Sequence, residues 1–277
     1  MPIWHALLFG IVEGLTEFLP ISSTGHLTVV ERLLGYQIDR PDITAFTAII
    51  QVGAVLATIM YLRKDIVRIV GGWFRGLINP AERGAGYRFG WAVIYGSIPI
   101  GIVGILFQHQ IETTLRSLWI VGGTLIAFSA VMLFADRVGT QNRHEKDVSW
   151  KDTIVIGVVQ CLALVPGVSR SGATMSAGLL RGLDRVAVTK LSFFLAIPAL
   201  AAAGILQTAQ QYDAISAGVG WGPTLVATVV SFVVAYASVA WLLMFIARHT
   251  YTSFVIYRVL AGVVVLALVG FGVIPAI

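Results

Sequence analysis

Six segments of this chain are long, apolar and almost free of charge, and they limit its fold more than any other feature. They lie at about residues 45–62, 91–108, 118–135, 188–206, 223–246 and 253–275. Each is long enough to cross a bilayer as a helix, which takes about 20 residues. In lipid every backbone amide must be paired within a helix or a closed barrel. The alternation of polar and apolar residues that a transmembrane barrel needs is absent. The sequence therefore predicts an all-α polytopic membrane protein with six transmembrane helices.

The composition removes other classes of protein. Of the 277 residues, 57% are hydrophobic and 12% are charged, whereas soluble domains average about 25% charged residues. The 19 Lys and Arg residues exceed the 14 Asp and Glu residues, but most of them lie in short loops, as in a topology signal rather than a nucleic-acid surface. The single Cys161 excludes a disulfide within one chain and a soft-metal cluster.

Two further apolar stretches, residues 3–36 and 153–182, are interrupted by a proline, glycines and hydroxyl residues. Because the interruptions fall at Pro20 and Pro166, neither stretch can form one straight helix. Each has room for two half-length helices joined by a polar turn, which is how a re-entrant hairpin enters a membrane when protein shields its backbone. We expect two re-entrant helical hairpins beside the six spans.

The two broken stretches resemble each other, so the chain carries a weak internal repeat. It divides a single membrane domain, residues 1–277, into halves of about 1–138 and 150–277. Since each half holds three spans, an odd number, the second half should be inverted relative to the first. The two hairpin tips should then meet inside the membrane from opposite sides.

The basic residues predict the orientation of these halves. They concentrate in residues 63–90, 136–152 and 181–190, which we expect on the cytoplasmic side. The loops at about 109–117 and 207–222 carry almost no basic residues and should face outward. Both termini should then lie outside.

Glu13 and Glu17 are the only acids between residues 3 and 30, and their i, i+4 spacing places both carboxylates on one helical face. A charge at membrane depth costs about 2.5 kcal/mol or more on insertion scales, so something must compensate the pair. A divalent cation would do so, because hard cations take carboxylate oxygens, and so would a shared proton. The alternative is that both acids lie in water at the interface.

The turn after Pro20 is rich in hydroxyl groups: Ser22, Ser23 and Thr24 precede His26. A serine becomes a nucleophile when a base can take its proton, and His26 is the candidate base for Ser23. In the alternative, His26 is itself the nucleophile. Ser22 and Thr24 are candidates for substrate binding, although the same hydroxyls would also suit helix caps.

The second turn contains Arg170, and no acid lies between residues 153 and 183. An arginine at membrane depth needs an anionic partner, either the two glutamates or a ligand phosphate, which its planar fork fits. Backbone amides of the turn, with Ser169, Ser171 and Thr174, would complete a phosphate cradle at the start of the next helix.

Arg258, at the start of the last apolar segment, has two interpretations. Its side chain reaches the membrane interface, as arginines near span ends often do, or it makes a second contact with a bound phosphate.

Two motifs carry a family resemblance. Residues 13–26, EGLTEFLPISSTGH, and residues 166–174, PGVSRSGAT, are similar to those of the undecaprenyl-diphosphate phosphatases of the bacitracin-resistance type. The likeness covers nearly the whole chain, including residues 160–164 and 256–258, with no departure inside either motif.

The resemblance implies hydrolysis of undecaprenyl diphosphate to undecaprenyl phosphate and inorganic phosphate, recycling the lipid carrier for the bacterial cell wall in the plasma membrane. It also implies dependence on a divalent cation, Mg²⁺ or Ca²⁺, and a site open to the outer face. The implied roles are metal binding or proton transfer for Glu13 and Glu17, attack for Ser23 or His26, and diphosphate binding for Arg170, Ser169 and Thr174. The expected partners are the polyprenyl diphosphate and membrane lipid, without nucleic acid, and a homodimer is compatible with this interpretation.

Three other functions compete with this one. A secondary transporter or lipid flippase shares inverted repeats and broken helices but releases no phosphate. The other membrane lipid-phosphatase superfamily also uses Ser-Gly-His and Ser-Arg elements, but its Lys-x6-Arg-Pro and His-x3-Asp elements are missing here. A purely structural membrane scaffold would leave Glu13, Glu17 and Arg170 without a reason.

Overall fold

The computed structural model describes residues 1–38, 40–107, 110–111, 115 and 117–276. Within these ranges the regular structure is helical, apart from one isolated bridge between Arg143 and Leu183. The α-helices are α1 (Ile3–Thr16), α2 (Ser23–Leu33), α3 (Pro41–Tyr61), α4 (Arg63–Ile78), α5 (Ala85–Leu106), α7 (Leu118–Val138), α8 (Trp150–Gln160), α9 (Arg170–Leu180), α10 (Arg185–Gln210), α11 (Tyr212–Ala217), α12 (Trp221–Ile246) and α13 (Thr252–Gly270). Short 3₁₀ helices are η1 (Pro80–Glu82), η3 (Glu145–Asp147) and η4 (Cys161–Leu164).

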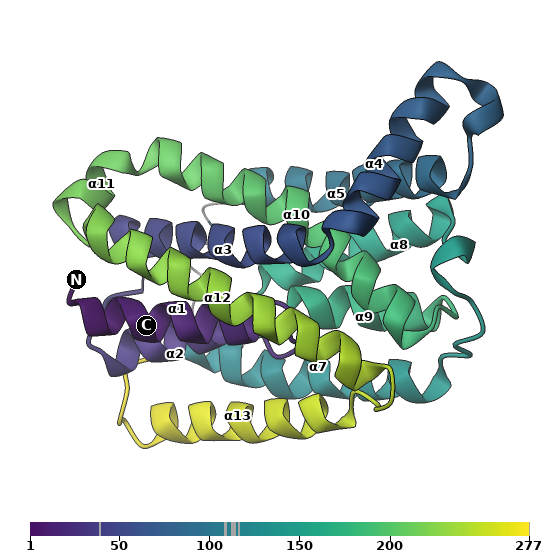
Figure 1. Cartoon of the computed structure of the whole chain (residues 1–277). Coiled ribbons are helices and arrows are strands. Elements are labelled where there is room, and N and C mark those ends of the chain that lie inside the picture. The colour runs from purple at the N-terminus through teal and green to yellow at the C-terminus, as the bar shows by residue number, and fades with distance from the viewer. Residues whose placement is uncertain (39, 108–109, 112–114, 116, 277) are drawn as a thin grey trace.

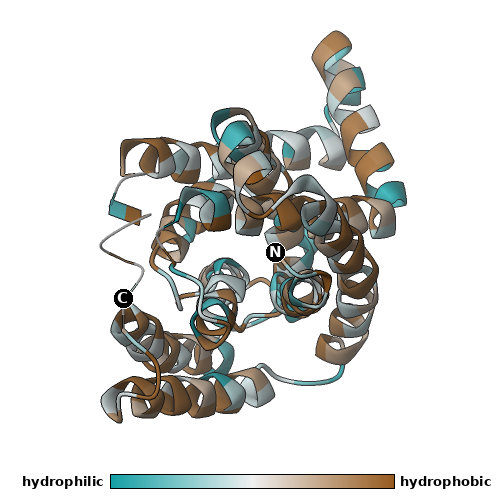
Figure 2. Ribbon diagram, turned by 90° about the vertical axis from the view of Figure 1, so that its left-hand side faces the viewer, coloured by the Kyte–Doolittle hydropathy of each residue, from teal (hydrophilic) through white to brown (hydrophobic). Residues whose placement is uncertain are grey.

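Six of these helices, α3, α5, α7, α10, α12 and α13, are long and apolar enough to cross a membrane. They coincide with the six predicted spans, which confirms the all-α polytopic fold. Residue 108, the last of the predicted second span, and most of the predicted 109–117 loop lie outside the described residues. Large apolar side chains such as Ile105, Leu225 and Met244 are more than 60% exposed on the outside of the bundle, where Figure 2 shows mostly hydrophobic colour. In a bilayer this surface faces lipid tails.

The two interrupted stretches are broken where the sequence predicts, into α1 and α2 and into α8, η4 and α9. In both turns a serine stands before the second helix with a positive φ, 76° at Ser22 and 75° at Ser169. Each serine Oγ accepts a hydrogen bond from the backbone N–H three residues later, Gly25 at 3.3 Å and Gly172 at 3.1 Å. The two turns thus share one kind of helix cap, while the inverted repeat and re-entry from opposite sides of the membrane stay predictions.

Helices of the two predicted halves pack against each other. Helix α1 of the first half packs on α12 of the second, and α8 of the second half packs on α5 of the first. Glycine permits both close approaches: a side chain on Gly14 would meet the backbone of Ser231 in α12, and one on Gly157 would meet the backbone of Gly96 in α5. Small residues at such crossings are how helices gain contact in lipid, where burial of apolar area supplies no driving force.

The two ends of the bundle differ in character. Figure 1 shows both termini and α11 at one end, and at the other end α4, which projects from the bundle, together with the connection between α7 and α8. Among the described residues, ion pairs join the basic segments near that second end, and most of them belong to two networks. One links Asp65 and Arg68 of α4 to Glu145 and Lys190.

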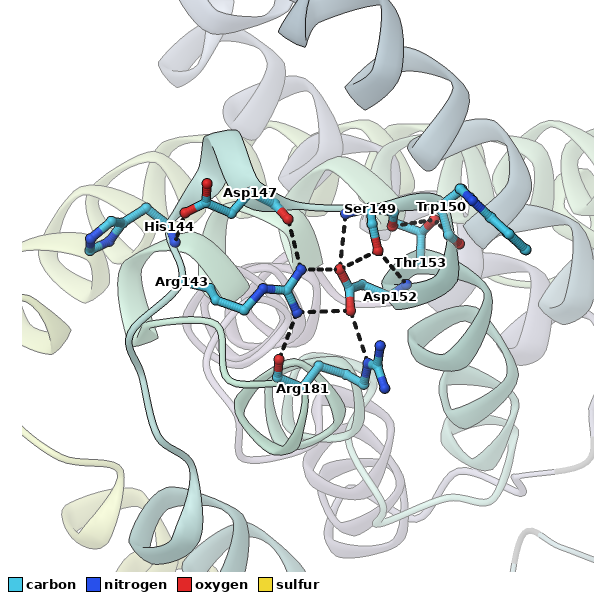
Figure 3. Close-up of polar contacts among 8 residues, drawn as sticks. All are labelled: Arg143, His144, Asp147, Ser149, Trp150, Asp152, Thr153 and Arg181. Atoms are coloured by element: carbon cyan, nitrogen blue, oxygen red, sulfur yellow. Dashed lines mark hydrogen bonds and ion pairs between the residues drawn. The ribbon is translucent and has the colours of Figure 1, made fainter.

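The other network is centred on Asp152, whose side chain is fully buried (Figure 3). Arg143 donates to both of its oxygens, at 3.1 and 2.6 Å, and Arg181 donates to Oδ1 at 2.9 Å. Ser149 adds its N–H and its hydroxyl. Burial opposes ionisation, but the hydrogen bonds from Arg143 and Ser149 hold the pKa of Asp152 well below its ordinary value. The network fastens the α7–α8 connection to the end of α9.

We expect Asp152→Asn to lower the free energy of unfolding by about 2 kcal/mol, because it leaves two arginines facing each other beside a neutral amide. A carboxylate with a lowered pKa stabilises the folded state at every pH above its ordinary pKa, and the stabilisation is lost as the pH falls through the lowered value. The melting-temperature gap between wild type and variant in detergent should therefore be constant from neutral pH to about pH 5. The control is Asp147→Asn, an exposed carboxylate of the same connection; a gap no larger than the control's would remove Asp152 from the stabilising contacts.

Candidate active site

A cavity of about 270 Å³ lies where the two turns face each other. From the first turn it is lined by Ser22, Ser23 and Thr24, with Glu17 just before them, and from the second by Ser169 and Arg170. The predicted meeting of the two turns is confirmed. Ser23 and Arg170 are the first residues of α2 and α9, so the positive ends of two helix dipoles lie at this cavity. Such ends favour a bound phosphate.

The hydroxyl of Ser23 is paired with a carboxylate. Its Oγ donates to Glu17 Oε2 at 2.5 Å, and both side chains are buried. A carboxylate at this distance is placed to take the serine proton. The structure therefore pairs a candidate nucleophile with a candidate base six residues away in the chain.

Among the described residues the hydrogen bonds of His26 go to groups other than Ser23. Its Nδ1–H donates to the carbonyl of Ser22 at 2.7 Å, and its Nε2 lies 2.7 Å from the hydroxyl of Tyr257 in α13. The two rings are stacked, with their centroids 5.6 Å apart. The predicted Ser23–His26 pair is wrong for this structure, because a tyrosine 231 residues along the chain engages the imidazole.

Glu13 lies behind Glu17 and is fully buried. The two carboxylates interact electrostatically with each other and with Arg170, as their shared helical face predicts. The alternative that both lie in interfacial water is wrong, since Glu17 is only 5% exposed. Among the described residues Glu13 has no hydrogen bond of ordinary geometry, and Glu17 is the group near enough to share a proton with it. A bound cation or a shared proton would satisfy the Glu13 oxygens.

Arg170 is held from one side and lines the cavity on another. Its Nη2 donates to Glu17 Oε1 at 3.3 Å, and its Nη1 donates to the carbonyl of Ser192 at 2.9 Å. The guanidinium also lies over the ring of Phe18, and its Nε has no partner in the described part of the chain. Both predicted partners of Arg170, the glutamates and a ligand phosphate, are compatible with this geometry. The arginine contacts Glu17 while part of its side chain lines the cavity.

Ser171 and Thr174 are turned away from the cavity. The hydroxyl of Ser171 donates to the carbonyl of Leu19 at 2.9 Å, and that of Thr174 lies 2.7 Å from the hydroxyl of Ser192. Both side chains are almost fully buried. In this structure they join the second turn to its neighbours, and Ser169 is the hydroxyl residue of that turn that reaches the predicted phosphate site.

Arg258 is fully buried, so the predicted extension to the membrane interface is wrong. It donates to the hydroxyl of Ser129 at 3.1 Å and to two carbonyls, Pro20 at 3.3 Å and Gly167 at 2.9 Å. These carbonyls belong to the two turns, so one side chain of α13 ties them together. It does not line the cavity. Sequence reasoning missed this role because backbone carbonyls carry no sequence signal.

Polar residues beyond the predicted set extend the cavity along α2, α3 and α10. They are Thr28, Glu31, Thr44, Thr47, Gln51 and Gln207. Glu31 is 2% exposed. For the α2 residues the sequence did contain a pattern that could have predicted this. Thr24, Thr28 and Glu31 follow one another at steps of four and three, so they share one face of the helix.

Comparison with known proteins identifies the family of this chain. The family model described as "Bacitracin resistance protein BacA" matches residues 6–264. A protein of Frankia casuarinae named "Undecaprenyl-diphosphatase 3" is 66% identical over the whole of both chains. "Undecaprenyl-diphosphatase" of Cutibacterium acnes is 53% identical over 98% of this chain and 99% of its own. "Undecaprenyl-diphosphatase 1" of Streptomyces coelicolor is 53% identical over 98% of this chain and 97% of its own. The chain belongs to the bacitracin resistance protein BacA family.

Proposed function

We propose that this protein hydrolyses undecaprenyl diphosphate to undecaprenyl phosphate and inorganic phosphate. The observation that carries the proposal is the buried pair of Ser23 and Glu17, which shares one cavity with Arg170 between two helix N-termini. A diphosphate needs an activated nucleophile and donors for the charge that develops on its oxygens. The full-length relatives named undecaprenyl-diphosphatase support the same substrate.

The geometry supports a two-step reaction. Ser23 Oγ attacks the terminal phosphorus while Glu17 accepts its proton, the bridging P–O bond breaks, and undecaprenyl phosphate leaves. Arg170 and the first amides of α2 and α9 stabilise the charge on the transferring group. Glu17 passes the serine proton to the departing undecaprenyl phosphate and is again a carboxylate. A water molecule then attacks the phosphoserine while Glu17 takes the water's proton; the phosphorus–Oγ bond breaks, Glu17 returns the proton to Ser23 Oγ, and inorganic phosphate is released.

The direct test is release of inorganic phosphate from a polyprenyl diphosphate by purified protein in detergent. The wild type should release one phosphate per lipid, with Ser23→Ala as the blank. A transporter or flippase with a phosphate site would bind the lipid and release nothing. That result would refute the proposed hydrolysis.

We also propose a divalent cation, Mg²⁺ or Ca²⁺, at Glu13 and Glu17. The oxygens of Glu13 beside Glu17 fit a hard cation. No group of three His, Cys, Asp or Glu suited to a metal occurs among the described residues, so the substrate's phosphate oxygens and water would complete the shell, as they commonly do for Mg²⁺. When bound, the cation would neutralise charge on the diphosphate.

Glu13→Gln is expected to weaken binding of the cation, because it removes one of the two carboxylates without changing side-chain volume. In wild type, Mg²⁺ or Ca²⁺ should raise the melting temperature even without substrate, since a ligand that binds only the folded state stabilises it. The variant should show a smaller shift at the same cation concentration and should require about tenfold or more additional cation for phosphate release. Glu31→Gln, a nearly buried acid on another wall of the cavity, is the control. A wild type without any cation-dependent shift would instead favour a proton shared by the two glutamates.

The protein is a multi-pass membrane protein, and we propose the bacterial plasma membrane with the site open to the outer face. The basic segments at the α4 end would then be cytoplasmic. In a Cys161→Ser background, an impermeant thiol reagent added to intact cells should label a cysteine at Ser216 of α11 and should not label one at Asn79 or Asn142. Labelling at either asparagine position would refute this orientation.

A further inference from the structure

A second hollow lies between α3, α4, α5 and α10, outside the catalytic cavity. It has a volume of about 360 Å³. Representative wall residues are Val70 and Phe74 from α4, Ile94 from α5, and Ile197 from α10. No charged or hydroxyl side chain lines it among the described residues. We refer to it as the α4–α5 groove.

The groove and the catalytic cavity adjoin on α10. Phe194 and Ile197 line the groove, while Leu200 and Ala203 line the cavity. Ile197 and Leu200 are three residues apart and so are neighbours on the helix surface, whereas Phe194 and Ala203, nine residues apart, face opposite sides of the helix. The two hollows therefore adjoin where Ile197 lies beside Leu200, and their combined lining winds around α10.

The other two shared helices agree. In α5, Val93 and Ile94 line the groove and Ile100 lines the cavity. In α3, Ile59 belongs to the groove and Gln51 to the cavity. Because α3, α5 and α10 each line both the groove and the catalytic cavity, the groove is a continuation of that cavity along these three helices.

Along α3, α5 and α10 the polar lining of the cavity is followed by the apolar lining of the groove. From the two turns the cavity extends toward Gln207, near the end of α10 that lies on the side of the termini, through a lining that includes Thr47 and Gln51. The groove lies in the opposite direction, toward α4. A lipid diphosphate has the same order, with a polar head followed by a hydrocarbon chain. The groove also lies beside lipid, since its α5 wall belongs to the least buried of the six candidate spans.

We propose that the α4–α5 groove holds a segment of the substrate's polyprenyl chain while the diphosphate occupies the cavity. This rests on the proposed function and adds to it a subsite that makes kcat/KM depend on the length of the polyprenyl chain. The bilayer is as apolar as the groove, so transfer of the chain gains no hydrophobic free energy. What the groove contributes is packing and a fixed direction for the chain, which hold the reacting phosphate in place.

The test fills the groove and compares a long substrate with a short one. Ile94→Trp, from the α5 wall, and Val70→Trp, from the α4 wall, would be assayed in nanodiscs with undecaprenyl diphosphate and with farnesyl diphosphate. Both wild-type side chains are about 40% exposed, at 38% and 44%, so tryptophan can be accepted without disrupting the core. We expect kcat/KM to fall about five- to tenfold for the long chain and to stay within about twofold for the short one.

The matched control is Ile102→Trp, two turns further along α5, which is 54% exposed and lines neither hollow. It should leave both substrates unchanged. Equal losses on both substrates would mean that the substitutions disturb the catalytic cavity, and unchanged kinetics would mean that bilayer lipid fills the groove; either result overturns the proposal. Hydrolysis of neither substrate by wild type would refute the proposed function itself, which is a separate outcome.

Discussion

Ser23→Ala is expected to lower kcat for phosphate release by about a thousandfold or more, because it removes the hydroxyl that Glu17 is placed to deprotonate. Glu17→Gln should lower kcat to a similar extent, since an amide cannot accept the proton. The double variant should be little worse than either single one, as for residues that act as a unit. Single-turnover and steady-state phosphate release would give these rates.

His26 provides the comparison for the base. Its two ring nitrogens contact Ser22 and Tyr257 instead of Ser23, so His26→Ala is expected to cost less activity than Glu17→Gln. Rapid quench with substrate labelled in the terminal phosphate should leave label on Ser23. Label on His26, or a His26→Ala variant as inactive as Ser23→Ala, would reverse the assignment, and label on neither would favour direct attack by water with Glu17 as base.

Arg170→Lys is expected to lose almost as much activity as Arg170→Ala, by about 100- to 1000-fold, because lysine keeps the charge but loses the planar two-point fork. The arginine uses one amino group on Glu17 and the other on the carbonyl of Ser192. Lysine can keep one of these contacts, so the lysine variant should melt close to wild type. Alanine leaves the Glu17 carboxylate without a basic side chain beside it and should lower the melting temperature.

The pair of readouts separates the two roles of this arginine. If Arg170 only neutralises Glu13 and Glu17, lysine should rescue both phosphate release and melting temperature. An active and stable lysine variant would thus remove Arg170 from the substrate site. Arg68→Lys, a change of the same kind in an exposed ion pair with Glu145, is the control and should change neither readout.

The sequence alone determined the parts of this protein that depend on local pattern. Length and apolarity predicted the six spans, because a helix that crosses lipid must satisfy its backbone within itself. Pro20 and Pro166 predicted the two breaks, since a proline cannot continue a helix interior. The i, i+4 spacing of Glu13 and Glu17 predicted a shared face, and the structure places the two carboxylates in electrostatic contact.

Only the tertiary structure decided which groups meet across the two halves. Sequence spacing paired Ser23 with His26, but the imidazole is engaged by Tyr257 of the second half, 231 residues away, and the serine donates to Glu17 within its own half. Arg258 of α13 was expected at the interface or on a bound phosphate, and it instead joins the two turns through their carbonyls. Periodicity shows which face of a helix carries a side chain, but the partner on that face depends on how helices from both halves pack, and these contacts run over 91 to 238 residues of chain.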